Sequence, residues 1–176
     1  MVFSLAEAES IAKEVDSGSG RFINPSKIDG ETRLRLYGEG ITGFEAWTTD
    51  NKPVRFETRP SELPDNIRKN EDGRDPLKRF IACLAWEYDT DSFKIISITQ
   101  KGLIKELMAY IADEDWGDPA GYDIKISRKG EGLQTEYTLK PAGKKPPSKA
   151  SSDAFAELAC DLSKIFDGED PFSEAL

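Results

Sequence analysis

The chain has 176 residues, a formal net charge of −9 and 38% hydrophobic residues, which indicates one globular domain with additional tails. It contains no histidine, and this excludes catalysis by a histidine general base or a histidine-containing triad. No stretch of about 18 apolar residues occurs and the first residues lack a signal-peptide pattern, so we expect a cytoplasmic protein without a transmembrane helix.

The negative charge is concentrated at the two ends of the chain. Residues 1–20 hold four acids and one base, and residues 150–176 hold seven acids and one base. Residues 21–149 hold 22 acids and 22 bases and are therefore neutral. The overall acidity thus does not argue against nucleic-acid binding by the middle of the chain, and such asymmetry is typical of an interaction tail.

The first predicted element is a helix in the sequence SLAEAESIAKEV. Ser4 and Glu7 have the spacing of a capping box, in which each side chain bonds the other residue's backbone N–H. Apolar residues recur on one helical face at positions 5, 8, 11, 12 and 15. The segment DSGSG follows, so residues 1–20 are predicted to form a helical arm with a flexible linker.

Alternation of apolar and polar residues predicts strands from residue 31 onward. In TRLRLY, Leu34 and Leu36 point to one face, whereas Arg33, Arg35 and Tyr37 point to the other. The strand continues in GITGFEAW after two glycines that suit a bulge. KPVRFET is predicted to return beside it after a turn.

A long loop, two strands, one helix and a hairpin are predicted next. Residues 59–77 are rich in Pro, Asn, Asp and Gly, as a long loop would be. KRFIACLAWEY and SFKIISITQ are predicted strands, and Trp86 and Tyr88 are interpreted as core beside Phe80 and Leu84. KGLIKELMAYIADE has the apolar stripe of a helix, with Trp116 pinning its end, and YDIKIS and LQTEYTL form a hairpin around RKGEG.

The last part of the chain is predicted to be a linker and an acidic tail. Residues 140–152 are rich in Lys, Pro and Ser, which is typical of a linker. DAFAELACDLSKIF is predicted to be a helix whose apolar face holds Phe155, Leu158, Leu162, Ile165 and Phe166. Cys83 and Cys160 lie far apart in the chain and are expected to be unpaired thiols.

These elements predict a mainly β fold with few strands, bends at glycine and one helix that plugs the sheet. We expect a small β-barrel of the OB type with an N-terminal helical arm and an acidic C-terminal tail, and a β-sandwich is the alternative. The expected parts are the arm at 1–20, the OB-fold domain at 21–140, and the linker with the tail at 141–176.

No motif of an enzyme class is present. The chain lacks a phosphate-binding P-loop, a nucleophile elbow and a dinucleotide fingerprint, so we do not expect an enzyme. The segment DEDWGD gathers carboxylates, but it lacks the ligand spacing of a calcium loop, and we interpret it as a solvated helix end and turn. No metal and no cofactor are expected.

Residue types suited to single-stranded nucleic acid recur on the predicted strands. Such binding needs cations for the phosphates and flat rings for the unstacked bases. A single aromatic ring in a small β-domain is more often part of the core, and Arg33 and Arg35 are equally compatible with ordinary solvated positions, so the prediction depends on the whole set. The candidate DNA-binding residues are Arg33, Arg35, Tyr37, Trp47, Arg55, Phe56, Arg59, Lys125, Arg128, Lys129 and Tyr137.

Residues 94–139 carry a resemblance to a known family. The segments ITQK (98–101), WGDP (116–119), YDI (122–124) and RKG (128–130) resemble phage single-stranded DNA-binding proteins with an OB-fold, distant relatives of the T-even phage helix-destabilising protein. The upstream stretch GFEAWTTDNKPVRF is similar in style to the same family. The resemblance spans about residues 30–140 and is most specific in its last part.

The resemblance implies largely sequence-independent binding of single-stranded DNA in phage replication, recombination and repair, in the host cytoplasm. It also implies an acidic tail that recruits partner proteins and self-association along the strand. DGEDPF resembles the tips of such tails, so the candidate partner-binding residues are Asp167, Glu169, Asp170, Pro171 and Phe172.

Three features depart from the family pattern. One is the amphipathic helix before the tail tip, which is expected to bind a neighbour or to fold back. SEAL follows Phe172, whereas Pro-Phe is the terminus in bacterial proteins, and the zinc ligands of the T-even member are absent. The tail, with a net charge of −6, is expected to occupy the basic groove when DNA is absent. The alternative function is an acidic β-barrel adaptor that binds proteins and no nucleic acid.

Overall fold

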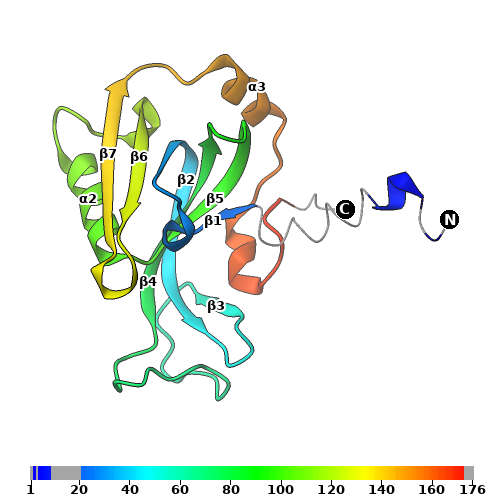
Figure 1. Ribbon diagram of the computed structural model, residues 1–176, viewed down its shortest axis with the longest axis vertical. Coiled ribbons are helices and arrows are strands. Elements are labelled where there is room, and N and C mark those ends of the chain that lie inside the picture. Colours follow the sequence, from blue (N-terminus) through cyan, green and yellow to red (C-terminus); the bar gives the residue numbers. More distant parts are fainter. Residues whose placement is uncertain (1, 3, 9–20, 173–176) are drawn as a thin grey trace.

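The computed structural model describes residues 2, 4–8 and 21–172. Its strands belong to one strongly curled sheet in the order β1-β5-β4-β2-β6-β7, with β3 paired to the far part of β2 (Figure 1). All pairs are antiparallel except β1 with β5. The strands are β1 (Phe22–Ile23), β2 (Glu31–Trp47), β3 (Pro53–Phe56), β4 (Lys78–Glu87), β5 (Ser92–Ile98), β6 (Tyr122–Lys129) and β7 (Glu136–Lys144).

Helices are few and short in the described part of the chain. The two α-helices outside residues 4–8 are α2 (Lys101–Ala112) and α3 (Lys149–Glu157). Short 3-10 helices are η1 (Pro25–Lys27), η2 (Pro119–Gly121), η3 (Gly132–Gln134) and η4 (Leu162–Asp167). The mainly β prediction is confirmed, and a single curled sheet agrees with a barrel and not with the two packed sheets of a sandwich.

The long strand β2 is the reason that the sheet curls. Its first residues pair with β6, and most of the strand pairs with β4. The pairing with β4 shifts between Tyr37 and Ile41, and Gly38 has a φ of 68° there. This is the bulge predicted from the two glycines, and it bends the strand so that one strand serves both halves of the sheet.

The main core lies between the concave face of the sheet and α2. Leu103 and Leu107 of α2 are buried against Ile124, Ile126 and Leu139 of β6 and β7. Leu34 and Leu36 point into the same cluster, as their alternation predicted. Trp116 packs edge-on against Tyr110 and Tyr122, which confirms that it fixes the end of the helix.

The predicted loop at residues 59–77 has a small core of its own beyond β3. Ala46, Ile67 and Leu77 are buried there, with Phe44 and Phe56 packed against them. Thr48 and Ile67 form an isolated antiparallel bridge, which ties the loop to the end of β2. The loop therefore extends the sheet downward as an ordered projection (Figure 1).

The outer face of β4 and β5 is covered by the C-terminal part of the chain. Ile165 of η4 is buried against Phe80, Ala82 and Ile95, and Phe166 lies with its ring 6.0 Å from that of Phe80. A Cβ added at Gly43 would meet the carbonyl oxygen of Phe56 at 2.4 Å, and the rings of Phe80 and Phe166 at 3.0 Å. Glycine thus permits this close packing.

Two expectations about local structure need correction, and one strand was missed. The predicted linker at 140–152 is wrong in its first half, because β7 continues to Lys144 and leaves only residues 145–148 before α3. The predicted single helix from 153 to 166 is also wrong, because α3 ends at Glu157 and η4 begins four residues after Leu158. Strand β1 was not predicted, since two residues are too few for a pattern.

The predicted arm is described only at its start. Residues 5–8 are helical, and Ser4 Oγ accepts a hydrogen bond from the Glu7 N–H while Glu7 Oε2 accepts one from the Ser4 N–H. The capping box is therefore confirmed. Residues 9–20 lie outside the described part of the chain. No described helix is both long enough and apolar enough to cross a membrane.

Candidate nucleic-acid interface

Three cations stand side by side on the outer face of the sheet. Arg33 of β2 is directly opposite Lys125 of β6, and Lys125 is directly opposite Lys140 of β7. Opposite residues of antiparallel strands point to the same face, so the three side chains form a line across three strands. We call Arg33, Lys125 and Lys140 the basic row.

The basic row has few acidic neighbours. Among the described residues, neither Lys125 nor Lys140 has a carboxylate within ion-pair distance, whereas Arg33 pairs with Asp123. Like charges directly opposite each other destabilise a sheet. An anion lying across the row removes this repulsion, so the arrangement suits a ligand that carries regularly spaced negative charges.

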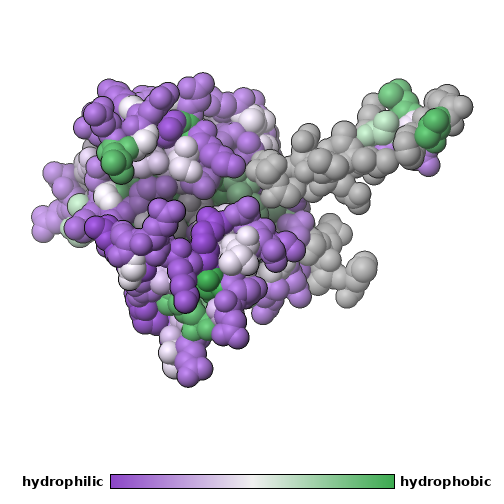
Figure 2. Space-filling model, turned by 60° about the horizontal axis from the view of Figure 1, so that its bottom comes forward, coloured by the Kyte–Doolittle hydropathy of each residue, from purple (hydrophilic) through white to green (hydrophobic). Residues whose placement is uncertain are grey.

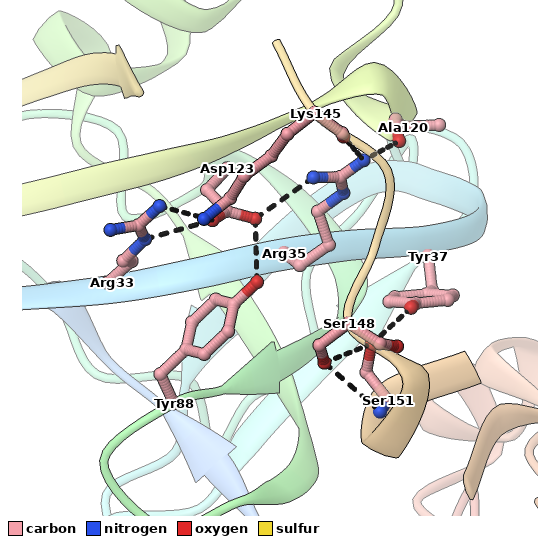
Figure 3. Close-up of polar contacts among 9 residues, drawn as sticks. All are labelled: Arg33, Arg35, Tyr37, Tyr88, Ala120, Asp123, Lys145, Ser148 and Ser151. Carbon is pink, nitrogen blue, oxygen red and sulfur yellow. Dashed lines mark hydrogen bonds and ion pairs between the residues drawn. The ribbon is translucent and has the colours of Figure 1, made fainter. Parts of the chain in front are cut away.

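Asp123 organises the cations next to the row (Figure 3). This carboxylate is fully buried and accepts hydrogen bonds from Arg33 at 2.7 Å, from Arg35 at 3.1 Å and from the Tyr88 hydroxyl at 2.8 Å. Lys145 Nζ lies 3.4 Å from it. One carboxylate therefore faces three cations, and this part of the outer face keeps an excess of positive charge.

The network shifts the pKa values of two of its members. Burial alone would raise the pKa of Asp123, but the hydrogen bonds from Arg33, Tyr88 and Arg35 outweigh burial and hold its pKa below the ordinary value. Burial, together with the hydrogen bond to Asp123, raises the pKa of Tyr88 to about 12. Asp123 is thus ionised and Tyr88 is neutral at physiological pH.

Arg35 has a structural position, contrary to the expectation that it faces solvent. Its side chain is 1% exposed, and its guanidinium donates hydrogen bonds to Asp123 and to the carbonyl oxygens of Ala120 and Lys145 (Figure 3). The residue is on the predicted face of β2, but residues 145–148 cross over it. In this arrangement Arg35 holds the crossing segment and is not open to a nucleic-acid strand.

Tyr37 is covered by the same C-terminal segment. Its hydroxyl lies 2.5 Å from the Ser151 hydroxyl, and its ring packs against Phe93 and Phe155. Ser148 caps α3 through the Ser151 N–H and lies beside this contact. Tyr37 therefore anchors α3 on the sheet in this arrangement.

A large cavity opens beyond the end of the basic row. It has a volume of about 710 Å³ and lies between η1, the far end of β2 with β3, and the turn between β4 and β5. Trp47 and Arg55, two of the predicted DNA-binding residues, line it, and Trp47 is 40% exposed. Figure 2 shows a mostly hydrophilic surface on this side of the molecule, hollowed near its centre.

The cavity and the basic row are neighbours along β2. Glu31 lines the cavity and stands two residues before Arg33, so both side chains are on one face of the strand. Arg128 also approaches the cavity wall, because its N–H donates to the Gly30 carbonyl and its guanidinium lies 3.5 Å from the Ile28 carbonyl. The cavity therefore opens beside the Arg33 end of the row.

The remaining predicted residues lie outside both the basic row and the cavity lining. Arg59 pairs with Asp75 and lies over the Phe44 ring, and Phe56 packs in the small core of the projecting loop. Tyr137 packs against the main core. Lys129 is exposed at the end of β6, on the hairpin that carries Lys125.

Two cations of the site were missed from the sequence, namely Lys140 and Lys145. Both belong to the segment KPAGKK, whose Pro and Gly residues indicated a linker. The signal was present, because Lys140 keeps the alternation of the preceding strand after the buried Leu139. Pro141 lies opposite Ile124 and does not interrupt the strand, which is consistent with its place at the edge of the sheet.

The predicted tail tip is docked on the body of the molecule. Pro171 is buried and its carbonyl accepts a hydrogen bond from the Asp161 N–H. Arg21 lies over the Phe172 ring at 4.6 Å. Asp167 and Glu169 are exposed, and the Phe172 N–H donates to Asp170.

Among the described residues, no three His, Cys, Asp or Glu side chains are grouped as metal ligands, and both cysteines are free thiols. Comparisons with protein-family models, with curated proteins and with solved structures gave no match to this chain.

Proposed function

We propose that this protein binds single-stranded DNA and that the basic row holds the phosphates. The observation that carries the proposal is the line of Arg33, Lys125 and Lys140 across three strands, next to an exposed Trp47 at a cavity mouth. Cations that track a backbone, together with a ring on which a base can stack, are the requirements of single-strand binding.

The order of the strands supports an OB-type barrel. Without β1 and β3, the sheet reads β5-β4-β2-β6-β7, and α2 connects β5 to β6. A five-stranded, partly open Greek-key barrel with a helix at this place is the OB architecture, whose usual ligands are oligonucleotides and oligosaccharides. The resemblance of residues 94–139 to phage single-stranded DNA-binding proteins points to the same ligand and to roles in replication, recombination and repair.

A binding titration tests the proposal. A labelled mixed-sequence single strand and the corresponding duplex are titrated with the full chain, at low and at moderate salt, by fluorescence anisotropy. We expect the single strand to bind more tightly and its affinity to fall with salt, because phosphate contacts release counterions. Equal binding of strand and duplex, or no binding at low salt, contradicts the proposal and favours the adaptor.

Variants of the row sharpen the test. Lys125→Gln and Lys140→Gln are expected to weaken binding and each to reduce the slope of log affinity against log salt by about 0.7. Lys105→Gln is the matched control, because Lys105 is exposed on α2, which packs on the opposite face of β6 and β7. If Lys105→Gln lowered the affinity for the single strand as much as the row variants do, the net charge of the whole molecule, and not the row, would govern binding.

We also propose that the acidic C-terminal segment recruits partner proteins. Asp167 and Glu169 are exposed and accessible without any rearrangement, whereas Pro171 and Phe172 are docked. A partner that reads the Pro-Phe pair therefore competes with the contacts to Asp161 and Arg21. Phe172→Ala is expected to abolish capture of such a partner while single-strand affinity is retained.

A further inference from the structure

The large cavity has a charge that is opposite to that of the basic row. Five carboxylates and three cations line it, which gives an excess of two negative charges. Arg55 pairs with Glu45 at 3.0 Å and Lys94 pairs with Glu87 at 2.8 Å, so two of the cations are already neutralised. The acids without an ion-pair partner among the described residues are Asp29, Glu31 and Asp89.

A cavity of this charge does not accept phosphates. Phosphate oxygens next to unpaired carboxylates are repelled, and the basic row lies close by to hold them instead. If a strand keeps its phosphates on the row, its bases are the groups that reach the cavity. Trp47, which is 40% exposed in the lining, then offers a ring on which a base can stack.

The lining is rich in acceptors of hydrogen bonds. An ionised carboxylate accepts hydrogen bonds and cannot donate them. The carboxylates of Asp29, Glu31 and Asp89 therefore offer acceptors to a ligand in the cavity.

We propose that the cavity prefers bases that carry an exocyclic amino group over thymine, an inference that rests on the proposed single-strand binding. The amino group of cytosine donates to carboxylates, and Asp and Glu are its usual partners in proteins. Thymine presents a carbonyl oxygen at the same position, and a carboxylate repels it. Glu31 and Asp89 are therefore specificity-determining residues, and the preference concerns base composition and not a sequence motif.

The test compares two pyrimidine strands that stack weakly and differ in their hydrogen-bonding edges. Labelled oligo-deoxycytidine and oligothymidine of equal length are titrated with the full chain at mildly alkaline pH, where cytosine is unprotonated. We expect the deoxycytidine strand to bind about tenfold more tightly, which corresponds to one good base contact. Oligo-deoxyuridine, which lacks the thymine methyl group but keeps its edge, should bind as oligothymidine does.

Two variants connect the preference to the cavity. Glu31→Gln combined with Asp89→Asn should bring the affinity ratio of the two strands close to one and should strengthen the binding of oligothymidine. Both side chains are exposed, so folding should be unaffected. Glu114→Gln, an exposed acid just after α2 and outside the cavity, should leave the ratio unchanged.

The outcomes separate this inference from the proposed function. Binding of all strands with oligothymidine equal to or tighter than oligo-deoxycytidine overturns the inference alone. A deoxycytidine preference that survives the double variant also overturns it, because the cavity carboxylates would not be its source. Absence of binding to any strand overturns the proposed function, and the inference with it.

Discussion

At the scale of single residues, the outer face depends on Asp123. Among the described residues, it is the one carboxylate that pairs with Arg33, Arg35 and Lys145, and it is fully buried. Arg35 is also buried, so its charge is tolerable only while this partner is present. The same ion pairs that stabilise the sheet also fix Arg33 at one end of the basic row.

Removal of this carboxylate should be costly. Asp123→Ala leaves the Arg35 guanidinium buried without its ionic partner, and we expect a loss of about 3–5 kcal/mol in the free energy of unfolding. Urea denaturation followed by circular dichroism measures it. Asp75→Ala is the matched control, because the Arg59–Asp75 pair is roughly half exposed and should contribute little. Equal effects of the two changes would show that the buried network is not more important than a surface pair.

The lowered pKa of Asp123 predicts how stability depends on pH. A carboxyl whose pKa is lower in the folded state stabilises the protein above its unfolded pKa, near 3.9. The contribution is lost as the pH falls through the folded value. Urea midpoints measured from neutral pH to about pH 3 should therefore fall more steeply for the native chain than for Asp123→Asn. Parallel curves would contradict an ionised Asp123 in the folded state.

The sequence predicted the face on which each residue of β2 lies, but not what covers that face. Arg33, Arg35 and Tyr37 do alternate with Leu34 and Leu36 as expected. Alternation cannot show that residues 145–155, more than a hundred positions later, cross the outer face and bury Arg35. The site therefore loses two predicted residues, Arg35 and Tyr37, which are covered. It gains Lys140 and Lys145, whose segment was interpreted as a linker.

At the scale of elements, the C-terminal segment behaves as part of the fold. Its apolar residues have helical spacing, which favoured one continuous helix in the sequence. The structure instead breaks the segment at residues 158–161, so that Phe155 reaches Tyr37 while Ile165 and Phe166 reach Phe80. The conformation of this segment is decided less by its helical periodicity than by burial of the apolar outer face of β4 and β5.

Docking of this segment is measurable through Ile165, its buried aliphatic side chain. Ile165 is 4% exposed, so Ile165→Ala should lower the free energy of unfolding by about 2–5 kcal/mol. Leu133→Ala is the control, because Leu133 is fully exposed at η3 and should change stability by less than about 0.5 kcal/mol. Thermal or urea unfolding of both variants measures these changes in the free energy of unfolding. An Ile165 variant as stable as the native chain would mean that η4 is undocked in solution.

At the scale of the whole molecule, the fold brings the acidic C-terminal segment and the basic row to the same outer face of the sheet. The acidic C-terminal segment lies on the outer face of the sheet, where the Tyr37–Ser151 contact holds α3 on β2 and η4 packs on β4 and β5. Its exposed acids include Asp153, Glu157, Asp167 and Glu169. Charges interact over about 10 Å at moderate salt, and we expect the acids of this segment to weaken the attraction of the outer face for a strand.

Neutralising these acids should therefore strengthen single-strand binding. Deletion of residues 150–176 is a poor test, since it also removes Ile165 and Phe166 from the apolar cover. The combined change Asp153→Asn, Glu157→Gln, Asp167→Asn and Glu169→Gln keeps the packing and removes four negative charges. We expect affinity to rise several-fold at low salt and to converge with the native value at high salt, because screening removes the effect. Anisotropy titrations across a salt series measure both, with the circular dichroism spectrum as the check on folding. An affinity that is unchanged at low salt would mean that the segment and the bound strand do not interact, and that the segment acts only as a cover for the sheet.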